Sequence, residues 1–480
     1  MLFNSLAFLV FLPIVFAVYW LAARSLRLQN LVVVAASYVF YGWWDWRFLW
    51  LMAFTSAWSY VAGLVELSRA DAGKPPSKFV VATSAFVNLG VLGAFKYYDF
   101  FIGEAVVFLG RLGFEAHAPS LRVILPVGIS FYTFQALSYT IDVYRRQIRP
   151  ARDPIAFFAY ISFFPQLVAG PIERAVNLLP QFTSPRRFDY AEAVVGCRQA
   201  LWGFFKKCVV ADNCAVLADA FLGGAYGAGG LAVWIGSLAF AIQIYGDFSG
   251  YSDIAIGISR LFGIRLMRNF AFPYFARDIA EFWRRWHISL TTWFRDYLYI
   301  PLGGSRCGTA RRIRNTFAIF LVSGLWHGAN WTFLAWGAFH AVLFLPLLLR
   351  GRNRDNTGVT AEDRALPSPA DVWHMFKTFF LVLLGWTIFR AQSIGEAACW
   401  LASMFDPRSF AFPAGVPRET AAAAVATLLM LFVEWFNRRE EWGFARLPRR
   451  TSLRWAVYIA VLWLVVFYAP GSQSFVYFQF

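Results

Sequence analysis

The chain has 480 residues, of which 59% are hydrophobic and only 15% are charged, whereas charged residues make up about 25% of a typical soluble domain. A soluble fold of this size could not cover so much apolar surface. The composition excludes a disordered chain, a disulfide-rich scaffold and an ordinary cytosolic enzyme, and it predicts an all-α polytopic membrane protein. The net charge is +16, but the basic residues lie in short clusters between apolar runs, which is typical of cytoplasmic loops rather than of a nucleic-acid-binding surface.

Apolar runs divide the chain into predicted membrane helices, because a spanning helix needs about 20 apolar residues. We expect about ten to twelve crossings, some of them tilted or partial. A polar insert at residues 351–370 is predicted to be a cytoplasmic loop. Charge-free runs occupy residues 2–23, 48–65, 79–95, 155–172, 220–246 and 455–480, and shorter apolar stretches lie near 31–44, 124–141, 378–389 and 420–433.

The basic residues beside the first and last runs indicate sidedness. Arg24 and Arg27 follow the first run, and an arginine cluster from Arg446 to Arg454 precedes the last one. Because basic loops stay in the cytoplasm, both ends of the chain are predicted to lie outside. The aromatic C-terminal tail, residues 470–480, is therefore expected to face the exterior.

One charge-free run is too long for a single crossing. Between Arg314 and Arg350 there are 35 residues without Lys, Arg, Asp or Glu, which as a helix would extend roughly 52 Å against a hydrocarbon core of roughly 30 Å. Both flanks are basic, so the run must turn back, and Gly328 to Asn330 is the expected break. The first arm would then be only about 20 Å long, which places His327 inside the membrane, where an ionisable residue is a functional candidate.

A second histidine lies in the segment FWRRWHISLTTWFRDYLYIP, which begins at Phe282. The segment is too charged to cross lipid easily, and it predicts a helix at the interface or along a polar cavity. Imidazole beside the guanidiniums of Arg284 and Arg285 suits a phosphorylated cofactor; the alternative is a structural histidine on a helix whose arginines snorkel. At helical spacing one face would hold Trp283, His287, Leu290, Thr291 and Phe294.

The segment GLWHGANW contains His327 between Trp326 and Asn330. A neutral imidazole can take a proton from a hydroxyl group near neutral pH. The alternative is a buried histidine that bonds a backbone carbonyl and packs between tryptophans.

A third segment, QIYGDFSGYSDIAIG, places Asp247 and Asp253 in an apolar stretch. These carboxylates are either part of a polar packing contact, which the close-packing glycines would favour, or the partner that fixes the tautomer of a catalytic histidine.

Five segments in this order resemble the membrane-bound O-acyltransferase (MBOAT) family, and in particular its bacterial polysaccharide branch, which includes the membrane subunits of alginate and peptidoglycan O-acetylation. They are PVGISFYTFQALSYTIDVYR, FFPQLVAGPIER, QIYGDFSGYSDIAIG, FWRRWHISLTTWFRDYLYIPLGG and GLWHGANW. The resemblance implies one membrane domain over residues 1–480, a ring of transmembrane helices around a thinned centre, with opposed cytoplasmic and external funnels.

The resemblance also implies roles for individual residues. His327 matches the family's catalytic histidine, and His287 matches its second histidine. Asp247, Asp253, Trp326 and Asn330 are expected to support them. Acetyl-CoA is the implied donor, with no permanently bound cofactor and no metal. Contacts to the CoA phosphates are expected from Arg284, Arg285, Arg311 and Arg312.

The chain ends FVYFQF, which resembles the F-x-Y-x-x-F ending of this branch, where the tyrosine is proposed as an acyl relay. Tyr477 is accordingly a candidate acyl acceptor that needs a base such as His327. The alternative is an aromatic anchor at the membrane interface.

The expected function is transfer of an acetyl group from cytosolic acetyl-CoA across the bacterial inner membrane, for O-acetylation of an extracytoplasmic polysaccharide such as alginate or peptidoglycan. The expected partner is a separate external acetyltransferase of the SGNH type. Two alternatives stay open: an acyltransferase that modifies a lipid or protein directly, and a proton-coupled transporter that uses His327, Asp247 and Asp253 as a relay.

Overall fold

A computed structural model describes residues 1–115, 124–168, 170–227, 229–410, 415, 417 and 419–468. Within these ranges the secondary structure is helical, without a strand, so the predicted all-α class is confirmed. Contacts divide the chain into two compact units. One comprises Met1–Ala193 with Ser259–Leu266, and the other comprises Val194–Ile258 with Met267–Phe480.

Six of the described helices are long and apolar enough to cross a membrane. Four further apolar helices are shorter, so the predicted ten to twelve crossings depend on these shorter helices as well. The multi-pass membrane character that composition predicts is confirmed. The six spans are Trp46–Asp71, Lys78–Lys96, Gly230–Leu261, Trp331–Leu349, Pro369–Arg390 and Glu419–Phe436.

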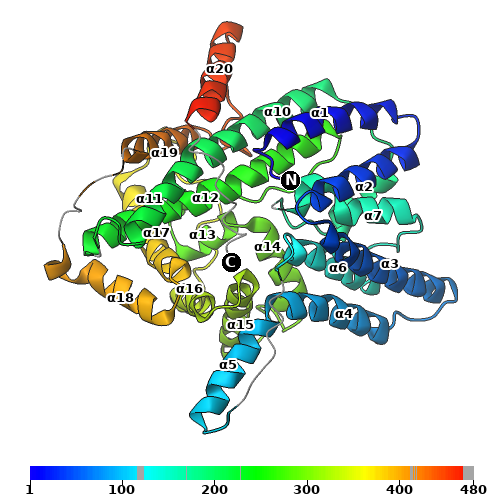
Figure 1. Cartoon of the computed structure of the whole chain (residues 1–480), viewed down its shortest axis with the longest axis horizontal. Coiled ribbons are helices and arrows are strands. Elements are labelled where there is room, and N and C mark those ends of the chain that lie inside the picture. Colours follow the sequence, from blue (N-terminus) through cyan, green and yellow to red (C-terminus); the bar gives the residue numbers. More distant parts are fainter. Residues whose placement is uncertain are drawn as a thin grey trace. The chain divides into compact units, whose positions relative to one another are not determined.

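The helices of the first unit begin where short polar side chains can cap them. Ser25 and Ser77 accept a backbone N–H of the first turn of α2 and α4, and Asp153 does the same before Pro154 at the start of α7. Within this unit α2 packs on α7, and α6 packs against α3 and α4. Its helices (Figure 1) are α1 (Leu6–Leu21), α2 (Leu26–Gly42), α3 (Leu49–Asp71), α4 (Lys78–Lys96), α5 (Tyr98–Arg111), α6 (Ile129–Tyr144), α7 (Pro154–Ser162), α8 (Phe164–Leu167) and α9 (Ala175–Thr183).

The second unit holds most of α10 (Tyr190–Phe204) and of α12 (Gly230–Leu261), together with the helices that follow. A π-helical turn, Phe205–Ala211, continues α10, and a second one, Arg295–Tyr299, continues α14. The remaining helices are α11 (Asp212–Leu222), α13 (Ile279–Arg285), α14 (Ile288–Phe294), α15 (Thr309–His327), α16 (Trp331–Leu349), α17 (Pro369–Arg390), α18 (Ile394–Phe405), α19 (Glu419–Phe436) and α20 (Thr451–Phe467).

Glycines allow α12 to lie close to the π-helical turn and to α10. A Cβ added to Gly250 would lie 2.8 Å from the carbonyl oxygen of Gly203, and one added to Gly246 would lie 3.2 Å from Cβ of Ala211. Because only hydrogen occupies these positions, the backbones approach closely. The close packing expected from the glycines of the segment QIYGDFSGYSDIAIG, which are Gly246 and Gly250, is confirmed.

The long charge-free run forms a helical hairpin, as predicted. Helix α15 ends at His327, and α16 begins at Trp331 after Asn330, whose side chain accepts the N–H of Thr332 and caps the new helix. The two helices pack against each other (Figure 1). The turn at residues 328–330 thus sets the end of α15 at the histidine.

Gly337 on α16 lies against the backbone of α15, and a side chain there is expected to separate the hairpin. A Cβ on Gly337 would lie 2.3 Å from the carbonyl oxygen of Phe320, so Gly337→Ala forces the helices apart and should destabilise the protein by about 1–3 kcal/mol. The readout is the midpoint of thermal denaturation in detergent. Gly90→Ala is the matched control, because the corresponding space on α4 is open and alanine favours helix. Equal midpoints for the two variants would contradict the expectation.

Candidate functional site

His287 and His327 line the same cavity in the second unit. Its volume is about 60 Å³, and its walls are largely apolar. Both histidines are buried, with 1% and 4% of their surfaces exposed. The structure therefore brings together the two histidines that the sequence singles out. The full lining is Trp283, Trp286, His287, Leu290, Thr291, Phe294, Ile319, Phe320, Ser323 and His327.

The predicted continuous helix through His287 is wrong. Helix α13 ends at Arg285, α14 begins at Ile288, and His287 between them adopts a left-handed backbone conformation with φ of 44°. A non-glycine residue in this region is uncommon and costs about 1–2 kcal/mol. Even so, all five residues predicted to share one face line the cavity. The backbone therefore breaks at His287, but its side chain still lines the cavity together with the four other residues of the predicted face.

Asn269, which is not among the residues predicted from the sequence, supports this break. Nδ1 of His287 lies 3.0 Å from Oδ1 of Asn269, and the N–H of Ile288 donates to the backbone carbonyl of Asn269 at 2.8 Å. Nε2 of His287 is buried without a hydrogen-bond partner among the described residues. Burial lowers the pKa of His287 to about 3, so the imidazole is neutral near pH 7. An asparagine in the loop before a WRRWH segment is the only sequence signal for this contact.

Aromatic rings surround His327 at the end of α15. The ring centroids of Trp326, Trp336 and Phe389 lie 5.0, 5.2 and 5.3 Å from that of the imidazole, each nearly perpendicular to it. Trp326 also lies 5.8 Å from the His287 ring. These walls keep the histidine away from solvent, with 4% of its surface exposed.

Asn330 and the two aspartates have structural contacts. Asn330 caps α16 and donates to the carbonyl of Gln392 at 2.9 Å. Asp247 pairs with Lys207 at 2.8 Å, and Asp253 pairs with Lys206 at 2.6 Å. These contacts agree with the packing interpretation of the aspartates, while Nδ1 of His287 contacts the amide of Asn269 at 3.0 Å and the hydroxyl of Ser289 at 3.4 Å.

Two of the four candidate arginines hold the polar segment at residues 351–370. Arg284 donates to the carbonyls of Asn353 and Asn356 at 2.7 and 2.6 Å. Arg285 pairs with Glu281 at 2.5 Å and donates to the carbonyl of Gly358 at 3.0 Å. Arg311 and Arg312 lie in the first turn of α15, where Arg312 donates to Thr309. Arg311 is exposed and Arg312 is partly exposed, so an anionic ligand can approach this second pair.

Tyr477 and the rest of the aromatic tail lie outside the described residues, so the proposed relay has no structural account. No group of three or more His, Cys, Asp or Glu side chains that could hold a metal ion is found in the part of the chain that the structure describes.

A family model described as MBOAT, membrane-bound O-acyltransferase family, matches residues 144–385, which include both histidines of the cavity. The chain belongs to this family. It is therefore an acyltransferase of the MBOAT type, and the resemblance seen in the sequence is confirmed.

Relatives with specific names match this MBOAT chain over most of its length. It is 39% identical to a probable alginate O-acetylase AlgI of Pseudomonas putida over 100% of both chains. It is 41% identical to the protein of the same name from Pseudomonas aeruginosa, over 85% of this chain and 75% of the relative. A peptidoglycan O-acetyltransferase of Helicobacter pylori is 34% identical over 83% of this chain and 78% of the relative.

Proposed function

We propose that this MBOAT protein transfers an acetyl group from acetyl-CoA to an extracytoplasmic polysaccharide, as the membrane component of an alginate or peptidoglycan O-acetylation system in the bacterial inner membrane. The observation that carries the proposal is the buried cavity shared by His287 and His327. Relatives named for alginate and peptidoglycan O-acetylation supply the class of acceptor. The cavity of about 60 Å³ is far smaller than the roughly 300–1,000 Å³ of pockets for drug-sized ligands, which favours a small acyl group.

In the proposed reaction His327 is the general base. Its imidazole takes the proton of a hydroxyl group while the hydroxyl oxygen attacks the thioester carbonyl of acetyl-CoA. The C–S bond breaks, the acetyl group becomes an ester of the hydroxyl oxygen, and the proton returns from the imidazolium to the CoA sulfur. His287 assists from the same cavity through its Nε2 atom. The apolar walls exclude water that would otherwise hydrolyse the thioester or the new ester.

The positions of the arginines divide their proposed roles. Arg311 and Arg312, at the start of the helix that ends at His327, contact the CoA phosphates. Arg284 and Arg285 hold the polar segment beside α13, because their donors bond its backbone carbonyls. A separate external acetyltransferase of the SGNH type receives the acetyl group and esterifies the polysaccharide.

The experiment that tests the function uses purified protein and acetyl-CoA with a radiolabelled acetyl group, with and without the external acetyltransferase and its polysaccharide. The expected result is release of CoA and label on the polysaccharide. Label on a lipid or on another protein would instead indicate that this protein acylates that acceptor directly. Substrate flux without thioester turnover, even with the partner present, would favour the transporter instead.

Tyr477 is proposed as the first acyl acceptor, and its phenol oxygen is the only group that Tyr477→Phe removes. The wild type should retain label on the chain, and Tyr477→Phe should lose that label and transfer to the polysaccharide, because phenylalanine cannot form the ester. Tyr468→Phe, a tyrosine just beyond α20, is the matched control. If Tyr477→Phe transferred acetyl groups at the wild-type rate, Tyr477 would not be the relay, and the proposed acyltransferase activity would still stand.

A further inference from the structure

Asn269 connects the histidine cavity with a second pocket in the same unit. The asparagine is fully buried. Its Oδ1 atom lies 3.0 Å from Nδ1 of His287 and accepts the hydroxyl of Ser289 at 2.9 Å, and its Nδ2 atom donates to Oγ of Ser252 at 2.9 Å. Its backbone carbonyl accepts the N–H of Ile288. Asn269 thus holds His287 and the first two residues of α14 through its side chain and its backbone carbonyl, and its amide nitrogen ties them to Ser252 on α12.

We infer that Asn269 is a positioning residue for the proposed transfer: it fixes His287 as the Nδ1–H tautomer and leaves Nε2 as the basic atom in the cavity shared with His327. The effect that this inference predicts on the reaction rate rests on the proposed function. Its structural part, the tautomer of His287, can be measured without any enzymatic activity.

The orientation of the amide follows from its neighbours. The backbone N–H of Ser289, which can only donate, points to the Asn269 atom assigned as Oδ1 at 3.3 Å, so this atom must be an acceptor and hence the oxygen. An amide oxygen cannot donate to Nδ1 of His287. The hydroxyl of Ser289 also lies 3.4 Å from Nδ1, but it donates its one proton to the same Asn269 oxygen at 2.9 Å, so Nδ1 carries the proton. A neutral imidazole has one proton, which leaves the lone pair on Nε2.

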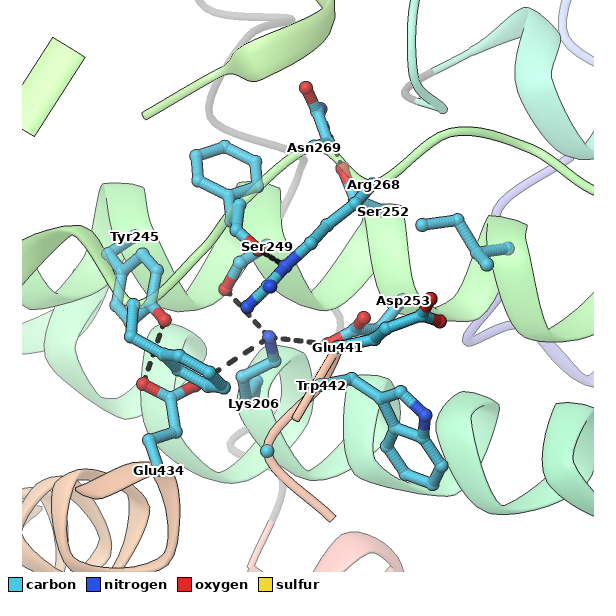
Figure 2. Close-up of a pocket in the computed structure, with 14 residues that line it drawn as sticks. Lys206, Tyr245, Ser249, Ser252, Asp253, Arg268, Asn269, Glu434, Glu441 and Trp442 are labelled. Carbon is cyan, nitrogen blue, oxygen red and sulfur yellow. Dashed lines mark hydrogen bonds and ion pairs between the residues drawn. The ribbon is translucent and has the colours of Figure 1, made fainter. Parts of the chain in front are cut away.

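The far side of Asn269 is a pocket of buried charges, which we call the charge pocket. Nζ of Lys206 lies 2.6 Å from a carboxylate oxygen of Asp253 and 3.9 Å from one of Glu434. Figure 2 shows the ammonium group between these two side chains. Ser249 accepts a hydrogen bond from Lys206 at 2.9 Å. The pocket lining also includes Arg268, Glu441 and the pair Ser252 and Asn269. Asn269 therefore borders both this pocket and His287.

An amide suits this boundary because it neither carries charge nor exchanges a proton with the imidazole. Besides Asn269 and the hydroxyl of Ser289 at Nδ1, the groups that face the His287 ring are the aromatic rings of Phe248, Phe270 and Trp326 and, across the cavity, His327. The charged groups of the charge pocket lie on the other side of the amide. A carboxylate at position 269 would favour the imidazolium form, whose Nε2 carries a proton and cannot act as a base.

The first test measures the tautomer by ¹⁵N NMR of protein labelled in the histidine rings. The chain has five histidines, so the variant His287→Gln assigns the signals of interest. The wild type should show a protonated Nδ1 and an unprotonated Nε2 on His287. Asn269→Leu should give a mixture of tautomers, and Asn88→Leu, which removes an equally buried asparagine from α4, should leave the wild-type signals.

The second test separates positioning from a structural role by kinetics. Asn269→Leu should lower kcat by at least about tenfold, as loss of a tautomer-fixing partner does, with the KM for acetyl-CoA unchanged. Asn269→Asp keeps the acceptor oxygen toward His287 and loses the donor to Ser252, so a merely structural role predicts no shift of the pH–rate profile. A positioning role predicts that the acid limb of the pH–rate profile moves up by about 1–3 pH units, because the carboxylate raises the pKa of the imidazolium.

Two results would overturn the inference: an Nε2–H tautomer of His287 in the wild type, or an unchanged tautomer in Asn269→Leu. An unmoved acid limb in Asn269→Asp would also count against it. Absence of thioester turnover in the wild type with the external partner present would instead contradict the proposed function, and the NMR result would still decide the role of Asn269.

Discussion

His327→Ala is expected to reduce the release of CoA from acetyl-CoA by about 10²–10⁴-fold, the range for loss of a general base. His327 lies at the end of α15 in a cavity that it shares with His287, and alanine leaves no group there that can take the hydroxyl proton. Release of CoA is followed with a thiol reagent, and transfer is followed by label on the polysaccharide.

The control for this variant is His374→Ala, because His374 lies exposed on α17. Both variants should reach the membrane and elute from size-exclusion chromatography like the wild type. Wild-type turnover in a folded His327→Ala protein would remove His327 from the proposed mechanism. An equal loss in His374→Ala would show that the assay reports general damage rather than chemistry.

Lys207→Met is expected to destabilise the fold by about 3–5 kcal/mol, the cost of removing one partner of a buried ion pair. Nζ of Lys207 lies 2.8 Å from a carboxylate oxygen of Asp212 and 2.8 Å from one of Asp247, and all three side chains are buried. Methionine fills the space of the lysine stem but leaves two buried carboxylates without their cation. The measurement is the midpoint of thermal denaturation in detergent.

Two further variants test the reason for this loss. Lys377→Met removes an exposed lysine from α17 and should leave the midpoint nearly unchanged. The combined variant Lys207→Met, Asp212→Asn, Asp247→Asn leaves no charge in the site, so it should recover most of the stability. A combined variant as unstable as Lys207→Met would show that the ion pairs are not the cause.

Local sequence patterns predicted the helical class, the membrane character and the hairpin at His327. The hairpin followed from one count, because 35 charge-free residues between basic flanks are too long for one crossing. The resemblance to the MBOAT family added the roles of His287 and His327, and the family itself is confirmed. Those roles, and that of Tyr477, stay predictions.

The details around His287 were not predictable from spacing. A helical face through Trp283 and Phe294 was expected, but Asn269, 18 residues before His287, holds the backbone in a left-handed turn. Likewise, the sequence left open a histidine-partner role for the carboxylates of Asp247 and Asp253, and only the fold pairs them with Lys207 and Lys206. In each case the deciding contact joins residues far apart in the chain.

The sequence by itself determined the class of this protein, the break after His327 and the family. These follow from composition, run length and motif order, none of which depends on which helices pack together. Only the tertiary structure decided that His287 and His327 share one cavity, that Arg284 and Arg285 hold a loop, and that Asn269 bonds the imidazole. The physical reason is that hydrogen bonds and ion pairs of buried polar groups depend on which helices pack together, and a buried group takes whichever partner that packing brings within about 3 Å.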